Sequence, residues 1–158
     1  MIKVKSILLV CTGNSCRSIM AEGLFKKYLK AAGKDNIEVR SAGIMALDGF
    51  PPTDETIKVM EGEDVDVSGY RSMRLTADLI INSDLILAME DMHKDYILKV
   101  DPSAADKTYL LKKFEAGKKR KYPEGDGVPD PIGKQIDFYK LSLGIIKEEA
   151  ERIVGLLQ

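Results

Sequence analysis

Residues 6–18 read SILLVCTGNSCRS, and this stretch decides the fold. Its apolar first half predicts a buried strand that runs into Cys11, and a helical pattern opens at Arg17. Between them stand Gly13 and Asn14, residue types that tolerate the left-handed backbone of a tight loop. The order strand, loop, helix predicts a cradle in which backbone N–H groups of the loop and the first helical turn converge on one point.

Cys11 and Arg17 would give this cradle its chemistry. A guanidinium six positions after the cysteine can hold two oxygens of a phosphate in a bidentate fork. The same positive surroundings favour the thiolate, which is the nucleophilic form of Cys11. We therefore predict a site that binds a tetrahedral oxyanion and attacks it. The alternative is an inert, buried cysteine, which the accompanying strand, Gly-Asn pair, Ser18 and helix disfavour.

Segments of strand and helix length alternate along the rest of the chain. The patterns predict strands over 6–10, 37–40, 84–88 and 108–111, and helices over 17–32, 51–62, 92–100 and from 135 onward. This alternation is typical of an α/β fold. We expect a single-domain three-layer sandwich over residues 1–158, with a four-stranded parallel sheet and helices on both faces. Ligands of such sheets bind at the carboxyl ends of strands, where Cys11 stands.

The composition excludes several classes of function. The chain has 24 Lys and Arg against 25 Asp and Glu, so its charge gives no argument for binding nucleic acid or an acidic membrane surface. It contains no apolar run of about 18 residues and no signal-peptide pattern at its start. Its two cysteines do not resemble a secreted disulfide framework. We expect a cytoplasmic protein that binds neither nucleic acid nor a membrane.

The loop resembles that of a known family once its neighbours are included. Residues 10–22, VCTGNSCRSIMAE, resemble the signature loop of the low-molecular-weight protein tyrosine phosphatases. Residues 41–43 (SAG) and 128–131 (VPDP) match further motifs of that family, and the resemblance covers essentially the whole chain. It implies a phosphoric monoester hydrolase in which Cys11 forms a thiophosphate intermediate, without a metal ion or organic cofactor.

The resemblance also implies roles for the residues around Cys11. Arg17 would bind phosphate oxygens and stabilise the transition state. Ser18 would donate a hydrogen bond to the thiolate, although it could equally be only a helix-start residue. Asn14 would hold the shape of the loop together with Ser41, for which a plain turn serine is an equal alternative. Phosphate binding and support of the loop are expected from Thr12, Gly13, Asn14, Ser15, Cys16, Ser18 and Ser41.

Asp130 is the predicted general acid. One carboxyl group on a loop can protonate the leaving group and later take a proton from water. Pro129 and Pro131 restrict the backbone on both sides of it. Asp126 in the same loop is the weaker alternative. The charged stretch 118–128 that leads to Asp130 is either functional or a solvated connection.

The remaining cysteine and the single histidine allow two interpretations each. Cys16 is close enough in sequence to Cys11 for a reversible disulfide that protects the nucleophile, or it is a small packing residue. His93 has no second His or Cys nearby. We therefore predict no metal site and expect His93 to be a surface residue.

Two substrates are compatible with the sequence, phosphotyrosine and phosphoarginine. The wider family acts mostly on phosphotyrosine, which is the main expectation, with Phe50 as an aromatic wall. The bacterial protein-arginine phosphatases of this fold have a small hydroxyl residue where this chain has Ser15, and an apolar residue then Gly where it has Ile132-Gly133. Phosphoarginine is therefore the alternative. The substrate pocket is expected to include Ser15, Phe50 and Ile132, and Tyr70 stands where several tyrosine phosphatases have a histidine.

Two other functions agree less well with the sequence. An arsenate reductase of this fold needs two further relay cysteines, and the chain has only Cys11 and Cys16. A phosphate-binding module without catalysis has no use for Cys11 or for Asp130. The expected partners are a phosphorylated protein substrate and, as ligands, inorganic phosphate or other oxyanions.

Overall fold

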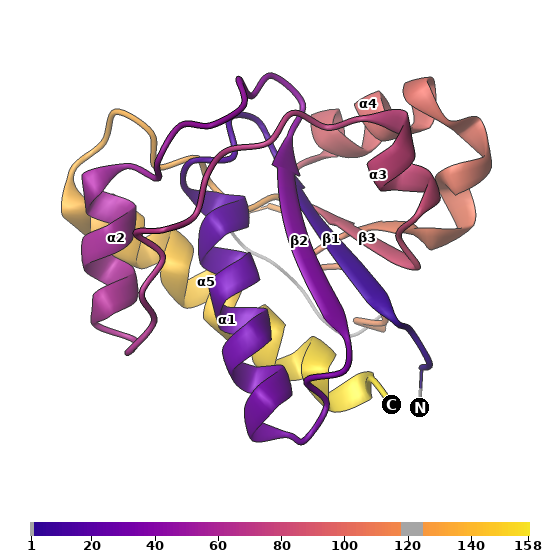
Figure 1. The fold of residues 1–158 in the computed structure, drawn as a ribbon, viewed down its shortest axis with the longest axis horizontal. Coiled ribbons are helices and arrows are strands. Elements are labelled where there is room, and N and C mark those ends of the chain that lie inside the picture. The colour runs from indigo at the N-terminus through magenta and orange to yellow at the C-terminus, as the bar shows by residue number, and fades with distance from the viewer. Residues whose placement is uncertain (1, 118–124) are drawn as a thin grey trace.

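The computed structural model describes residues 2–117 and 125–158, and these form one sheet covered by helices (Figure 1). The predicted strands and helices are all present, with bounds that differ by up to three residues. Two short helices, α3 and η1, had not been predicted. In chain order the elements are β1 (Ser6–Cys11), α1 (Arg17–Ala31), β2 (Glu38–Gly43), α2 (Asp54–Glu61), α3 (Ala77–Ile81), β3 (Leu85–Ala88), α4 (Asp91–Val100), the 3-10 helix η1 (Pro102–Lys107), β4 (Thr108–Leu110) and α5 (Ile136–Leu156).

The sheet has four parallel strands in the order β2-β1-β3-β4. Helices α1, α2 and α5 lie on one side of it, and α3 and α4 lie on the other, as Figure 1 shows. This arrangement confirms the predicted α/β three-layer sandwich. None of the helices in the described ranges is long and apolar enough to cross a membrane.

The apolar run of β1 follows from burial on both faces of the sheet. Ile7 and Leu9 pack into the core under α1 and α5, whereas Leu8 and Val10 pack into the core under α3 and α4. All four side chains are at most 1% exposed. A strand in the middle of a parallel sheet therefore reads as a continuous apolar run, without alternation.

The topology places the end of β1 at a switch point of the sheet. The chain leaves β1 through α1 to β2 on one side, and it later enters β3 on the other side of β1. Crevices open at such points beyond the carboxyl ends of the strands. Cys11, the last residue of β1, stands there. Of the stretch predicted to be irregular, 118–128, residues 118–124 lie outside the described residues.

Gly43, at the end of β2, lets this strand approach the loop after Cys11 very closely. A Cβ atom on Gly43 would lie 2.5 Å from the Thr12 carbonyl oxygen and 2.8 Å from the Asn14 nitrogen. Ile44 N–H donates to the Cys11 carbonyl and Met45 N–H to the Thr12 carbonyl. No larger residue fits here without displacing the loop, which gives the Ser-Ala-Gly motif a structural reason.

Candidate active site

The loop from Thr12 to Cys16 wraps around the sulfur of Cys11. Asn14 has a positive φ of 53°, whereas Gly13 does not have a positive φ, so only one of the two expected residues takes the left-handed conformation. This conformation turns the Asn14 N–H toward Cys11, whose Sγ accepts it at 3.3 Å. A cavity of about 220 Å³ opens above; its lining comprises Cys11, Thr12, Gly13, Ser15, Cys16, Arg17, Asp130 and Ile132.

A chain of uncharged hydrogen bonds fixes one side of the cavity. The Asn14 side-chain amide donates to Ser18 Oγ at 2.7 Å and to Ser41 Oγ at 2.9 Å. Since Ser18 accepts from Asn14, its own proton is available for Cys11 Sγ, 2.9 Å away. Asn14, Ser18 and Ser41 are all at most 6% exposed. The arrangement directs two hydrogen-bond donors at the sulfur, as a thiolate requires.

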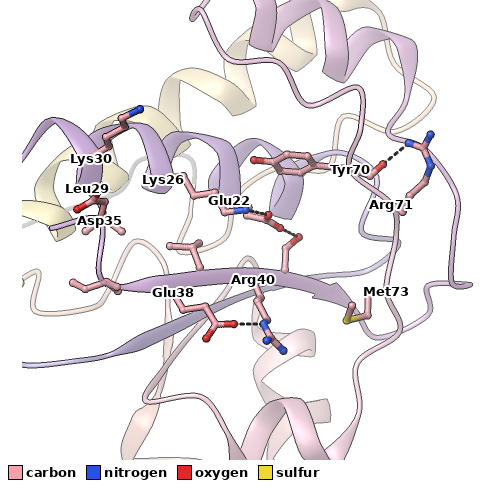
Figure 2. A pocket seen from close by; sticks show the side chains of 13 residues that line it. Glu22, Lys26, Leu29, Lys30, Asp35, Glu38, Arg40, Tyr70, Arg71 and Met73 are labelled. Carbon is pink, nitrogen blue, oxygen red and sulfur yellow. Dashed lines mark hydrogen bonds and ion pairs between the residues drawn. The ribbon is translucent and has the colours of Figure 1, made fainter. Parts of the chain in front are cut away.

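Glu22 completes this network, although no sequence pattern predicted a role for it. Its carboxylate accepts from Ser41 Oγ at 2.6 Å and from Lys26 Nζ at 2.6 Å (Figure 2). Lys26 Nζ in turn lies 5.0 Å from the centre of the Tyr70 ring, and burial raises the pKa of Tyr70. Tyr70 thus contacts the network through Lys26. The spacing of Glu22 four residues after Ser18 on α1 could have indicated a shared helix face.

Charged groups form the opposite side of the cavity, around the buried guanidinium of Arg17. Arg17 Nη1 donates to Glu90 Oε2 at 2.6 Å and to the Val128 carbonyl at 2.9 Å. Its Nη2 lies 3.4 Å from Thr12 Oγ1 and 3.4 Å from Asp130 Oδ2. Glu90 therefore holds one end of the guanidinium, and the other end faces the cavity.

The expectation that His93 is a surface residue was wrong. Its side chain is fully buried, and its Nε2 lies 2.9 Å from Thr12 Oγ1. Burial, followed by the nearby Arg17 charge, lowers the pKa of His93 from 6.5 to about 4, so the ring is neutral near pH 7. Because Nδ1 accepts from the Glu90 N–H, the proton is on Nε2 and is donated to Thr12.

This tautomer determines the direction of the Thr12 hydroxyl. Thr12 Oγ1 accepts from His93 and, at 3.4 Å, from Arg17. Its own proton is therefore left to donate, and Thr12 lines the cavity. The helix-start spacing Glu90-x-x-His93 was a signal for this arrangement, because the two residues form a capping box at the start of α4.

The two candidate acids differ in position. Asp130 lines the cavity with its side chain 38% exposed, and its Oδ1 accepts the Ile132 N–H at 3.1 Å. Asp126 does not line the cavity and pairs with Lys113 Nζ at 2.8 Å. The geometry therefore favours Asp130 as the acid that can reach a ligand above Cys11.

Cys16 lies at the start of α1 among hydroxyl groups. Its Sγ is 3.5 Å from Tyr139 Oη and 3.6 Å from Thr53 Oγ1. Burial raises the pKa of Tyr139 to about 12. Cys11 and Cys16 are both free and buried, and the reversible disulfide stays a prediction.

The residues expected to form the substrate pocket do not all meet. Ser15 and Ile132 line the cavity, and Ile132 is 49% exposed at its rim. Phe50 is 57% exposed and is not part of the cavity lining. The Ser15 carbonyl accepts from Thr53 N–H and Thr56 Oγ1, so the start of α2 supports the loop. Among the described residues, no cluster of three or more His, Cys, Asp or Glu could hold a metal ion.

Comparisons with known proteins agree with this geometry. A sequence model of the family described as low molecular weight phosphotyrosine protein phosphatase matches residues 6–158. The chain is 37% identical over 152 residues to the protein-arginine-phosphatase of Bacillus subtilis, with 96% of each chain covered. It is 32% identical over 150 residues to the low molecular weight protein-tyrosine-phosphatase Etp of Escherichia coli, with 95% of this chain and 93% of that protein covered.

A solved structure of related shape carries a ligand of the expected chemistry. The structure of Vibrio vulnificus Wzb in complex with benzylphosphonate matches with a TM-score of 0.83 and 32% identity. The match covers 96% of this chain and 98% of that one. The chain therefore belongs to the low molecular weight phosphotyrosine protein phosphatase family.

Proposed function

We propose that this protein is a cysteine-dependent phosphatase that hydrolyses phosphotyrosine on proteins through a thiophosphate intermediate at Cys11. One observation carries the proposal: the Cys11 sulfur, with hydrogen-bond donors from Asn14 and Ser18, shares a cavity with Arg17 and Asp130. Nucleophile, oxyanion clamp and acid are the three groups that phosphomonoester hydrolysis by covalent catalysis requires.

In the first step, the Cys11 thiolate attacks the phosphorus atom. The P–S bond forms as the bond to the tyrosine oxygen breaks, and Asp130, protonated at this stage, gives its proton to the departing oxygen. Arg17 Nη2 exchanges its 3.4 Å contact with Asp130 for the phosphoryl oxygens and stabilises their charge. The Thr12 hydroxyl and the loop N–H groups supply further donors.

In the second step, water releases the phosphate. The Asp130 carboxylate takes a proton from the water, whose oxygen attacks phosphorus, and the electrons of the P–S bond return to Cys11 as the thiolate. The Ser18 hydroxyl stabilises this leaving group through its contact with the sulfur at 2.9 Å. The mechanism needs neither a metal ion nor an organic cofactor.

A protein-arginine phosphatase is the second candidate, and the lining of the cavity favours it. Ser15 and Ile132 line the cavity, and among residues 2–117 and 125–158 its lining includes no aromatic residue that would stack on a tyrosine ring. A small hydroxyl residue leaves room and polarity for a guanidinium, which a large aliphatic side chain would exclude. An arsenate reductase is disfavoured because Cys11 and Cys16 are the only cysteines of the chain.

The test compares kcat/KM for phosphotyrosine and phosphoarginine peptides with the same flanking residues. A preference for phosphotyrosine is expected. A clear preference for phosphoarginine would replace the proposal by the second candidate, and Ser15→Ile should then reverse that preference. The Cys11→Ser protein, prepared in the same way, controls for contaminating phosphatases. Turnover of neither peptide would contradict both candidates.

A phosphorylated protein is the proposed partner, and inorganic phosphate the proposed product. The expected cytoplasmic location remains a prediction from the sequence. The same holds for the expectation that the protein binds neither nucleic acid nor a membrane.

A further inference from the structure

The outer edge of β2 carries backbone groups without a partner strand. Glu38 N–H donates to the Lys5 carbonyl and Ile44 N–H to the Cys11 carbonyl, so every second residue of β2 faces β1. The backbone N–H and C=O groups of Val39 and Ser41 therefore point away from β1, toward the open edge of the sheet. Among residues 2–117 and 125–158, the backbone N–H and C=O groups of these two residues have no hydrogen-bond partner.

The surface is hollowed on both faces of this edge, so a strand could approach it. A cavity of about 720 Å³ lies on the α1 side, between β2 and the side chains of Glu22 and Tyr70 (Figure 2). A second cavity, of about 550 Å³, lies toward α3, and the two share Glu38, Arg40 and Met73 in their linings. Figure 2 shows Glu38 and Arg40 pointing to the opposite side of β2 from Glu22 and Tyr70.

The chain itself already pairs with the last residue of this edge. Gly43 N–H donates to the Met73 carbonyl, and Leu75 N–H donates to the Gly43 carbonyl, both at 2.9 Å. This bridge is parallel and stops at Gly43. The edge therefore has the geometry for a further strand, and the segment along Val39 and Ser41 is left open.

If two copies of β2 pair antiparallel, Glu38 and Arg40 of one copy meet opposite charges on the other in one register only. Glu38 and Arg40 are two residues apart on the same face, where they pair with each other within the chain, and their side chains are 55% and 59% exposed. In an antiparallel pair of two β2 strands centred on Val39, Glu38 of each copy stands opposite Arg40 of the other. A shift of this pairing by two residues places Glu38 opposite Glu38 or Arg40 opposite Arg40, which is unfavourable.

We propose that the protein forms a two-fold dimer in which β2 pairs antiparallel with β2 of a second copy, joining two sheets into one of eight strands. In this register, the two Val39 residues exchange two backbone hydrogen bonds. Each Ser41 N–H donates to the Ile37 carbonyl of the other copy, because Ile37 also faces outward while its own N–H is held by Lys34. The two ion pairs between Glu38 and Arg40 stand at the flanking, more closely spaced positions.

The dimer is expected to be weak and to depend on protein concentration. A single strand pair buries little surface, which is typical of transient contacts. Exposed ion pairs add little affinity, so the charges act mainly by selecting the register. Charged residues also commonly protect sheet edges from pairing. On this edge, however, Glu38 and Arg40 meet like charges of a second copy only when the register is shifted, so they do not oppose pairing in the proposed register. The proposal does not depend on the phosphatase activity.

Sedimentation velocity over a concentration series up to the millimolar range tests the dimer. Arg40→Glu places like charges opposite each other and should weaken association about tenfold or more. The double variant Glu38→Arg/Arg40→Glu restores opposite charges and should restore association. Lys58→Glu makes the same charge change at an exposed site on α2 and should have no effect. A wild-type protein that stays monomeric throughout, or a dimer insensitive to Arg40→Glu, would overturn the proposal.

Cysteine cross-linking tests the register independently of charge. Opposite residues of a closely spaced antiparallel pair have Cα atoms about 4.5 Å apart, within disulfide range. Glu38→Cys and Arg40→Cys chains, mixed and oxidised with glutathione disulfide, should form a covalent dimer. Either variant alone should not, since its cysteine faces an unchanged residue. The buried Cys11 and Cys16 are common to all samples. Equal cross-linking in the single-variant samples, or none in the mixture, would contradict this register.

Discussion

The two sides of the Cys11 cavity are built from different kinds of interaction. On the side of Asn14, the hydrogen bonds from Ser41 through Asn14 and Ser18 to the sulfur join uncharged, buried side chains. The charged Glu22 lies behind Ser41, away from the sulfur. On the side of Arg17, contacts are charged, and the one to Asp130 is long, at 3.4 Å, with Asp130 38% exposed. The uncharged side holds the sulfur in place before a ligand arrives, whereas the charged side includes a contact that a phosphate can replace.

Of the substitutions on the two sides of the cavity, replacement of Arg17 should cause the largest loss of activity. Arg17→Lys keeps the charge but loses the fork that reaches Glu90, Thr12 and Asp130 together. We expect kcat/KM for an aryl phosphate to fall about 10³-fold, with weaker inhibition by inorganic phosphate. Steady-state kinetics measure both effects. Activity within a few-fold of the wild-type value would mean that a simple positive charge suffices and the fork has no role.

Substitution of Asp130 tests whether the carboxylate that contacts Arg17 is also the general acid. Asp130→Asn keeps the shape and can still accept the Ile132 N–H, but it has no proton to give. We expect kcat to fall about 10²-fold for leaving groups that need protonation, and much less for nitrophenolate-type leaving groups. Asp126→Asn, outside the cavity, is the matched control and should leave kcat unchanged. The same loss for all leaving groups would remove Asp130 from the acid role.

Gly43 tests how rigidly the uncharged side must be packed. Gly43→Ala pushes a methyl group against the Thr12 carbonyl and the Asn14 nitrogen, and we expect the free energy of unfolding to fall by roughly 1–3 kcal/mol. Activity should fall too, because the displaced loop holds the donors to Cys11. Gly144→Ala on α5 is the control: no atom lies within 4 Å of the new group, and stability should rise slightly. Denaturant titration compares them, and equal stability of the two variants would contradict the close approach.

Substitution of His93 has the smallest expected effect near neutral pH, and it is visible mainly in the pH dependence of stability. Its folded-state pKa of about 4 lies below the unfolded value of 6.5, so between these values only the unfolded chain takes up the proton. The resulting stability is full above about pH 6.5 and is lost as pH falls toward 4, by of order 2–3 kcal/mol. His93→Gln should lack this part of the pH dependence in denaturant titrations. Identical pH profiles for the two proteins would show that His93 titrates normally.

The parts of the site that could be predicted are those formed by residues close together in the sequence. The run into Cys11, the Gly-Asn pair and Arg17 lie within one strand, one loop and one helical turn, so local patterns suffice. The parallel sheet followed from the alternation of strands and helices. Helices α3 and η1 are five and six residues long, too short to show a periodic apolar stripe.

The parts that could not be predicted depend on contacts between distant segments. His93 is buried because α4 brings it to Thr12, 81 residues away in sequence. Glu90 contacts Arg17 across 73 residues, and the Glu90-x-x-His93 spacing indicates a helix start but not the distant partners of these two residues. Phe50 was placed at the pocket because of its residue type alone, and its position outside the cavity lining is set by the loop between β2 and α2.

The proposed chemistry depends on the Cys11 sulfur, held by Asn14 and Ser18, forming the covalent intermediate. The most direct measurement is rapid quenching of the enzyme with an aryl phosphate, followed by mass spectrometry of the peptide that contains Cys11. We expect one added phosphoryl group on Cys11 during turnover, and for Cys11→Ser no turnover but retained phosphate binding. Full turnover by Cys11→Ser, or a phosphoryl group found on another residue, would contradict it.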